Sequence, residues 1–552
     1  MSDFHPVIIK LALQNTLRSA SNFMADLARD KPKAVLIELS GSLPMREKKR
    51  KWTEFPPEFG PKPLSIEQLE HSITQIAEAA FIEKVIFRFE AMQLGLTSAE
   101  ILRKQFARLQ AAGKKVIVYA SQLGMASYYL ASLADELVLP ESAELQILGF
   151  ALEQSFLKDA LGRFGIEAEK VAIKEYKTAG DTLVRSHMSE TDREQLSALL
   201  EGFEDHLYSE IAKARKVELE TVKGWINKGI SSAEVAREVG MIDRVAYEDE
   251  LIGEKHVLVE EAQRFLKSNR RSLTAGRVGV ITLEGAIMTG KSRRSPVPFP
   301  LIGGTFAGSE SLIAAFRAAE EDDTTKAIVF YVDSGGGSAL ASDLIWREVA
   351  RINPLKPIIA VMGQYAASGG YYVLTHAQKV LASPTTLTGS IGVVGTQLIL
   401  EEFNAKYGIN VDVIQRGRFA RVNSSAKSLD PEERAYLERS IAEVYDRFIS
   451  RVAEGRKLTK ERVNELGRGR IWTGQAALEH GLVDELGDIF KGISIAKEVA
   501  KLAPDARVYN VSVPKNYKLP QVDSLETFID SFNPLLNERL LLIHPWGVRL
   551  RV

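Results

Sequence analysis

The sequence is defined first by what it lacks. It has no cysteine among its 552 residues, which excludes disulfides, thiol catalysis and cysteine-bound metals. Its formal net charge is −1, so bulk attraction to nucleic acid is not expected. No segment approaches the roughly 18–20 uninterrupted apolar residues of a membrane span. The first residues also lack the basic start and long apolar core of a signal peptide, so none is expected.

An amphipathic helix is predicted over residues 7–28. Apolar side chains recur there at steps of three and four residues, as on one face of a helix. This face either packs on the body of the protein or lies on a membrane surface. It comprises Ile9, Leu13, Leu17, Ala20, Met24 and Leu27.

The chain repeats itself once, with low identity but a nearly constant register. The pair Tyr128-Tyr129 corresponds to Tyr371-Tyr372, an offset of 243 residues (371 − 128). The same offset relates "VIFRFEAMQLG" to "IVFYVDSGGGS" and "RFGIEAEKV" to "KYGINVDVI". Such a long-range correspondence predicts a duplicated domain.

Each copy alternates β-branched runs with helical patterns, which is typical of parallel βαβ units. We therefore expect an α/β fold with two tandem domains. The expected divisions are an N-terminal helix (1–30), a first repeat domain (31–265), a linker (266–277), a second repeat domain (278–505) and a tail (506–552). Two long loops rich in Lys, Arg, Pro and aromatics fall at equivalent places, and they are either solvated or form a rim that meets substrate or membrane headgroups.

The segment "YAASGGYY" places Ser368 at the junction of an apolar strand and a helix. The preceding strand ends in "SGGGS", whose glycines free backbone N–H groups. A nucleophilic serine with oxyanion donors from Gly336, Gly337 and Gly369 is one interpretation; ordinary tight turns are the other. The first copy has Met125 opposite Ser368 and "AMQL" opposite "SGGG", which favours the catalytic interpretation.

A base for Ser368 is not obvious among the eight histidines. His376 lies two helical turns away, too far for a hydrogen bond, so we expect it to be structural. A buried lysine can serve if its pKa falls from about 10.4 toward neutrality. Lys174 and Lys177 of "AIKEYKTAGD" are solvated lysines or candidates for this role. Lys177 is favoured because its counterpart is Ala420, so each copy retains what the other has lost.

These motifs resemble the long, two-domain form of the signal peptide peptidase A family, serine proteases with a Clp-protease/crotonase-like fold. "AASGGY" matches that family's nucleophile motif and "YKTA" its lysine motif, while "SGGGS" replaces a proline by Gly335. "SPTTLTGSIGV" and "WTGQAALEHGLVDELG" also match. The resemblance implies Ser368 as nucleophile, Lys177 as general base and Ser390 as the residue that orients the lysine.

The resemblance further implies cleavage of remnant signal peptides and unfolded apolar segments by a homotetramer, without cofactor or metal. It implies peripheral membrane association, with the cytoplasm as the alternative location. Two other functions stay open: a crotonase-type acyl-CoA hydrolase or hydratase, and a non-catalytic membrane-associated scaffold. No nucleic acid partner is expected.

Overall fold

The computed structural model describes residues 6–46, 64–251, 256–294, 305–511, 541–543 and 548–551. Parts of both long loops and most of the tail therefore lie outside the described residues. The chain forms two compact units. The first comprises residues 1–151 and 203–275, and the second comprises residues 152–202 and 276–551.

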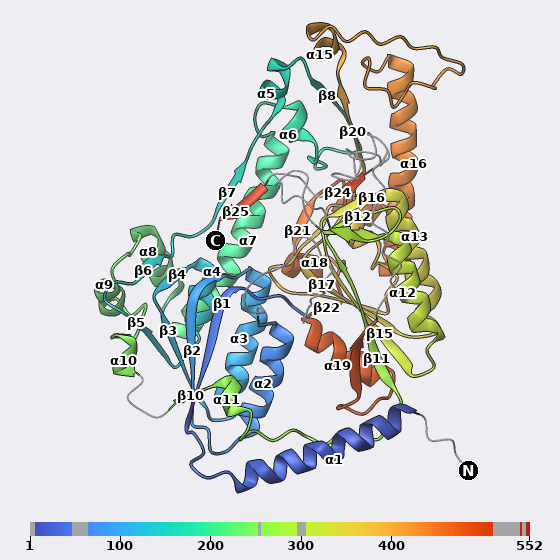
Figure 1. Cartoon of the computed structure of the whole chain (residues 1–552). Helices are drawn as coiled ribbons and strands as arrows, with labels where there is room; N and C mark the ends of the chain where they lie inside the picture. Colours follow the sequence, from blue (N-terminus) through green and yellow to red (C-terminus); the bar gives the residue numbers. More distant parts are fainter. Residues whose placement is uncertain are drawn as a thin grey trace, which may run out of the picture. The chain divides into compact units, whose positions relative to one another are not determined.

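The first unit is built on a six-stranded parallel sheet. Its spatial order is β10-β1-β2-β3-β5-β9 (Figure 1). The central strands β1, β2 and β3 are rich in Val, Ile and Phe, and these apolar side chains are buried, as expected for strands covered on both faces. The bounds are β1 (Ala34–Ser42), β2 (Lys84–Gln93), β3 (Lys115–Ala120), β5 (Glu136–Leu139), β9 (Arg244–Val245) and β10 (His256–Leu258).

The main sheet of the second unit repeats this topology. The strands β23, β11, β15, β17, β18 and β22 pair in the order of their counterparts β10, β1, β2, β3, β5 and β9. The duplication inferred from the sequence is thus also present in the strand order. The bounds are β11 (Arg277–Glu284), β15 (Thr325–Ser334), β17 (Ile358–Ala367), β18 (Lys379–Ala382), β22 (Glu485–Leu486) and β23 (Arg507–Asn510).

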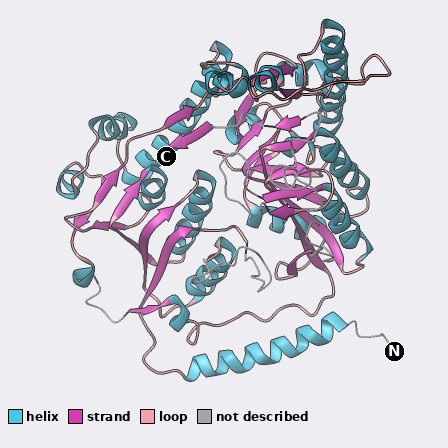
Figure 2. Ribbon diagram, turned by 45° about the horizontal axis from the view of Figure 1, so that its top comes forward, coloured by secondary structure: helices cyan, strands magenta, loops and turns pink. Residues whose placement is uncertain are grey.

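Helices flank the sheets of both units (Figure 2). Helix α13 (Ala339–Ile352) turns Ile345, Val349 and Ile352 into the core of the second unit. In the same core the rings of Phe316 and Phe330 meet edge to face, 5.0 Å apart. The other long helices are α2 (Ile66–Glu78), α3 (Leu96–Ala111), α7 (Glu190–Arg215), α8 (Leu219–Lys228), α12 (Ser309–Glu321), α16 (Pro431–Arg456) and α19 (Ile489–Val499).

The compact units depart from the expected tandem boundaries in two places. Residues 152–202 come from the first copy in sequence but belong to the second unit, because β8 (Glu167–Ala172) pairs antiparallel with β20 (Val394–Ile399) along six residues. The second copy also extends beyond the expected limit of 505, because β23 adds to β11 as β10 adds to β1. Short edge strands such as β23 carry too little sequence pattern to be placed in advance.

A second, seven-stranded sheet of this unit carries β8 and β20, in the order β13-β14-β12-β16-β24-β20-β8. Its other bounds are β12 (Ala286–Met288), β13 (Arg293–Arg294), β14 (Thr305–Gly308), β16 (Gly336–Ser338) and β24 (Leu541–Ile543). The remaining strands are β4 (Gln122–Gly124), β6 (Glu144–Gln146), β7 (Ala151–Gln154), β19 (Leu387–Gly389), β21 (Ile471–Thr473) and β25 (Val548–Arg551). The short helices are α4 (Met125–Ala131), α5 (Lys158–Arg163), α6 (Asp181–Val184), α9 (Ala233–Glu238), α10 (Glu248–Leu251), α11 (Val259–Ala262), α14 (Gly369–Tyr372), α15 (Glu401–Lys406), α17 (Lys460–Leu466) and α18 (Gly474–Glu479).

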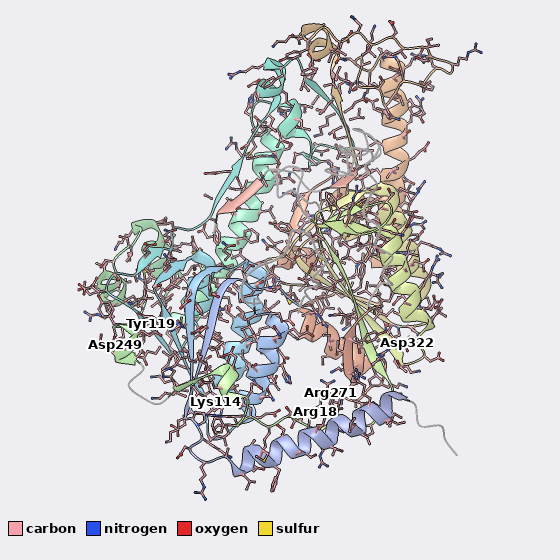
Figure 3. All side chains as sticks on the ribbon, in the orientation of Figure 1. Arg18, Lys114, Tyr119, Asp249, Arg271 and Asp322 are labelled. Atoms are coloured by element: carbon pink, nitrogen blue, oxygen red, sulfur yellow. The ribbon has the colours of Figure 1, made fainter. Side chains whose placement is uncertain are left out.

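The predicted N-terminal helix is α1 (Pro6–Leu27), and the side that attaches it carries Asn15 and Asn22 together with the buried Leu11 and Ala25. Asn15 exchanges hydrogen bonds with the backbone of Arg271, and Asn22 does so with Ser268. Figure 3 shows Arg18 and Arg271 along this contact. The apolar face is turned outward instead: Ile9, Leu13, Leu17, Phe23, Met24 and Leu27 are each 59–64% exposed. None of the described helices is long and apolar enough to cross a membrane.

Candidate active site

Ser368 occupies a strained turn between β17 and α14. Its backbone angles are φ 54° and ψ −114°, a region that non-glycine residues seldom adopt. The turn is held by the Ser368 N–H, which donates to the Gly389 carbonyl at 2.8 Å. A β-carbon on Gly370 would lie 2.4 Å from the Ser334 carbonyl oxygen, so only glycine lets α14 approach the end of β15 this closely. The serine is fully buried.

Lys177 lies on the turn between β8 and α6, within the second unit, and is 1% exposed. Its Nζ is 2.7 Å from Ser368 Oγ. It is also 3.0 Å from both the Oγ and the carbonyl oxygen of Ser390. The structure thus brings Lys177 together with two serines that lie 191 and 213 residues further along the chain.

The environment of Lys177 favours the neutral amine. Burial lowers the pKa of Lys177 well below its usual value, and the positive charge of Lys170 lowers it further. No carboxylate contacts its Nζ within the described part of the chain. A neutral amine at hydrogen-bond distance from a hydroxyl can accept its proton.

Ser390, like Ser368, has a positive φ and a backbone hydrogen bond that fixes its turn. It is fully buried, has φ 51°, and donates its N–H to the Arg470 carbonyl at 2.6 Å. This left-handed conformation follows β19 and turns both of its oxygens to the Lys177 amine. Two acceptors in fixed positions restrict where that amine can point.

The turn that carries Lys177 is fixed from the other side by residues that sequence reasoning missed. Tyr176 N–H donates to the Arg468 carbonyl at 3.1 Å. A β-carbon on Gly469 would lie 2.3 Å from the backbone nitrogen of Lys177, so glycine is required for this approach. Behind the turn, Thr178 donates to the buried Asp192 at 2.7 Å. These contacts join distant segments, and no local pattern identifies them.

Lys170 on β8 is a further residue without a sequence signal. Its Nζ donates to the Lys177 carbonyl at 2.7 Å and pairs with the Asp181 carboxylate. It therefore fixes the backbone of the turn and places a positive charge near the Lys177 amine.

The three expected backbone donors differ in their surroundings. The Gly336 N–H already donates to Ser334 Oγ at 3.1 Å. Gly337 lies in the middle of β16, with φ 159°. Gly369 is the first residue of α14, so its N–H has no acceptor within that helix.

The other residues considered from the sequence are His376, Met125 and Ala420, and none of them takes part in the Ser368–Lys177 contact. His376 accepts a hydrogen bond from Trp346 Nε1 at 2.9 Å, a structural contact as expected. Met125 is buried at the start of α4, and Ala420 is exposed on a turn. No cluster of His, Asp or Glu among the described residues could hold a metal ion.

We predict that replacing Lys170 shifts the pH dependence of Ser368 reactivity. In Lys170→Met the positive charge is lost and Asp181 loses its partner, so the pKa of Lys177 rises. The neutral amine then forms only at higher pH. The rate of Ser368 labelling by a fluorophosphonate, measured against pH, should rise at higher pH than in the wild type.

Lys174→Met is the matched control, because Lys174 is exposed and lies on the same turn. Its profile should coincide with that of the wild type. An unchanged midpoint in Lys170→Met, or a shift to lower pH, contradicts the prediction.

Comparison with known proteins gives matches along both copies. The model of Peptidase family S49 matches residues 108–261 and 351–503. The two matches begin 243 residues apart (351 − 108), the offset found in the sequence. A ClpP1 chain from Listeria monocytogenes also matches, at 15% identity and a TM-score of 0.25, over 39% of this chain and 94% of that chain.

Several relatives match over most of their length. The chloroplastic serine protease SPPA of Arabidopsis thaliana is 32% identical, over 83% of this chain and 69% of that protein. Protease 4 of Salmonella typhi is 30% identical, over 73% of this chain and 67% of that protein. A putative signal peptide peptidase SppA from Enterococcus faecium is 33% identical over 36% of this chain. The expected tandem α/β organisation and serine protease activity are thereby confirmed, and the chain belongs to Peptidase family S49.

Proposed function

We propose that Ser368 and Lys177 form the catalytic dyad of this serine protease, with Ser368 as nucleophile and Lys177 as general base. The observation that carries the proposal is the 2.7 Å approach of a buried lysine amine, without a carboxylate partner, to a buried serine hydroxyl on a strained turn. Ser390 orients the amine through its two oxygens.

The reaction then proceeds by acyl transfer. Ser368 Oγ attacks the peptide carbonyl carbon while its proton moves to Lys177 Nζ. The resulting ammonium gives that proton to the leaving amine as the C–N bond breaks. A water molecule attacks the acyl-enzyme, again losing a proton to Lys177, and the serine hydroxyl is restored with release of the acid.

Backbone N–H groups would stabilise the oxyanion. Gly369 at the start of α14 and Gly337 on β16 are the first candidates. Gly336 joins them once its N–H leaves Ser334 Oγ. One such donor is typically worth about 10²–10³ in rate.

The proposed substrates are remnant signal peptides and other unfolded apolar segments. The name of the Enterococcus faecium relative as a putative signal peptide peptidase supports this class. The alternatives, an acyl-CoA hydrolase or hydratase and a non-catalytic scaffold, are not favoured by relatives named as proteases.

Removing either member of the dyad should abolish peptide cleavage. We expect Ser368→Ala and Lys177→Ala to lose at least about 10³-fold in kcat, because the two side chains act as a unit. Cleavage of an apolar fluorogenic peptide measures this, and fluorophosphonate labelling should disappear in Ser368→Ala. Lys174→Ala is the control and should retain wild-type cleavage; activity that survives in Lys177→Ala would falsify the assigned base.

Helix α1 is the proposed point of peripheral membrane contact. Asn15 and Asn22 attach it to residues 268–271, while Leu13 and Leu17 are more than 60% exposed. Lys10, an exposed residue of the same helix, suits an anionic lipid surface. Such contact would bring the enzyme to the membrane where apolar peptides accumulate.

Vesicle binding tests this contact. Full-length protein should float with vesicles of phosphatidylcholine and phosphatidylglycerol. Leu13→Asp/Leu17→Asp should bind at least about tenfold more weakly, because two exposed leucines no longer enter the lipid. Leu355→Asp, at an exposed leucine outside α1, is the control. Equal flotation of all three proteins, or none by the wild type, contradicts the proposal.

We also propose a homo-oligomer, a tetramer by the family resemblance. The repeat offset relates β8 to residues 410–415, and β20 to a segment that includes β7. Strands β8 and β20 pair within the chain, whereas residues 410–415 form no strand. The side chains of Val411, Val413 and Ile414 are 51%, 50% and 98% exposed. A second copy can supply the missing partner by offering its β7 to this segment.

Mass photometry of the full chain measures the assembly. The wild type should be oligomeric, and Val411→Asp/Ile414→Asp should shift it toward the monomer, because two exposed apolar side chains become charged at the proposed contact. Leu355→Asp should leave the oligomer intact. A monomeric wild type, or an unaffected double variant, refutes this interface.

A further inference from the structure

The first turn of α7 holds the turn that carries Lys177. Asp192, the third residue of α7, is fully buried, and its Oδ1 accepts the Thr178 hydroxyl at 2.7 Å. Gln195 Nε2 donates to the same Oδ1 at 2.9 Å and to Thr178 Oγ1 at 3.1 Å. Three buried side chains thus form a closed set of hydrogen bonds around the residue that follows Lys177.

The same part of α7 also holds the residue that precedes Lys177. The Tyr176 hydroxyl donates to the Glu194 carboxylate at 3.0 Å, and Gln195 Nε2 donates to the Tyr176 carbonyl at 3.4 Å. The Lys177 side chain itself reaches Ser368 Oγ. Because a lysine side chain is long and flexible, the place of its amine depends on where this backbone is held.

Asp192 has no contact with the reacting atoms. The hydrogen-bond partners of Lys177 Nζ in the described structure are Ser368 and Ser390. Asp192 Oδ2 is buried and has no hydrogen-bond partner within the described part of the chain. An unpaired buried oxygen is unfavourable, so stability alone does not favour a carboxylate here. The use of this side chain is the bond that Oδ1 makes to Thr178.

The second copy has the same arrangement at the equivalent place. Its long helix α16 begins 241 residues after α7 (431 − 190), and its third residue, Glu433, is also fully buried. Glu433 accepts a hydrogen bond from Arg421, the counterpart of Thr178 at the offset of 243 (421 − 178), at 2.9 Å. Only the first copy carries a lysine before this residue. There the partner is an uncharged threonine, which holds the turn without adding an ionic charge next to Lys177.

We propose that Asp192 is a positioning residue of this protease: by holding Thr178, it fixes where the Lys177 amine meets Ser368 Oγ. The inference rests on the proposed dyad and adds a residue on which its geometry depends. Proton transfer requires the amine and the hydroxyl to stay within hydrogen-bond distance. A displacement of about 1 Å can lower a rate by about 10²-fold.

The test compares Asp192→Ala with Asp192→Asn in the full chain. Alanine removes the acceptor, so we expect kcat for an apolar peptide, and the rate of Ser368 labelling by a fluorophosphonate, to fall about 10–100-fold. KM should stay within about twofold, because the lost interaction serves the chemical step. Asparagine keeps an acceptor oxygen for Thr178 and should restore both rates to within about threefold of the wild type.

Circular dichroism and the end point of labelling separate positioning from loss of folded protein. A merely destabilised variant loses folded molecules at the assay temperature, whereas a displaced amine slows labelling in protein that stays folded and still reaches one label per chain. Asp159→Ala is the matched control. Asp159 accepts the Ser186 hydroxyl at 2.8 Å in the same unit, so this variant loses the same kind of bond and should label at the wild-type rate.

Thr178→Val supplies the second measurement. It removes the hydroxyl and should slow labelling as Asp192→Ala does, and the double variant should be no slower than either single variant. Folded Asp192→Ala with wild-type kcat and labelling rate overturns the proposal, as do additive losses in the double variant or no recovery in Asp192→Asn. Failure of the dyad itself is distinguishable, because Lys177→Ala would then retain activity.

Discussion

The geometry of the candidate site depends on one unusual burial. The Lys177 amine is buried beside the Ser368 hydroxyl, and it has no carboxylate partner in the described structure. An ammonium group in such a place would lack compensation for its lost hydration, so the amine is driven toward the neutral form. The positive charge of Lys170 lowers the pKa of Lys177 further. Lys170 is itself held by Asp181 and by the Lys177 carbonyl. The surrounding contacts hold the Lys177 amine at one position beside Ser368.

That position is fixed by backbone conformations that few residues tolerate. Ser368 and Ser390 both have positive φ, and both donate their N–H groups to carbonyls of neighbouring strands or loops. Gly370 and Gly469 let backbone approach where a β-carbon would collide. Strain of this kind persists only when surrounding structure over-determines it, which is typical of functional sites.

The duplication explains how such a site is shared between two copies of one scaffold. The main sheets of the two units have the same strand order, yet the lysine turn of the first copy belongs to the second unit through the β8–β20 pairing. The proposed dyad therefore takes Lys177 from one copy and Ser368 from the other. Because β8 pairs with β20 within the chain, residues 410–415 form no strand. Strand β24 of the tail lies between β16 and β20.

The duplication, the α/β class and a partnership of Ser368 with Lys177 could be predicted from the sequence, because repeat register and short motifs are linear properties of the chain. The sequence did not place Arg468, Gly469, Asp192 or Lys170 around the lysine, since these contacts join segments with no common pattern. The sequence also left open which face of α1 is covered. The structure shows that the predicted apolar face of this helix is exposed. Nor could the sequence place Leu541 against Ala179, Met288, Phe306 and Val394, because a three-residue strand is specified by the edges that receive it and not by its own periodicity.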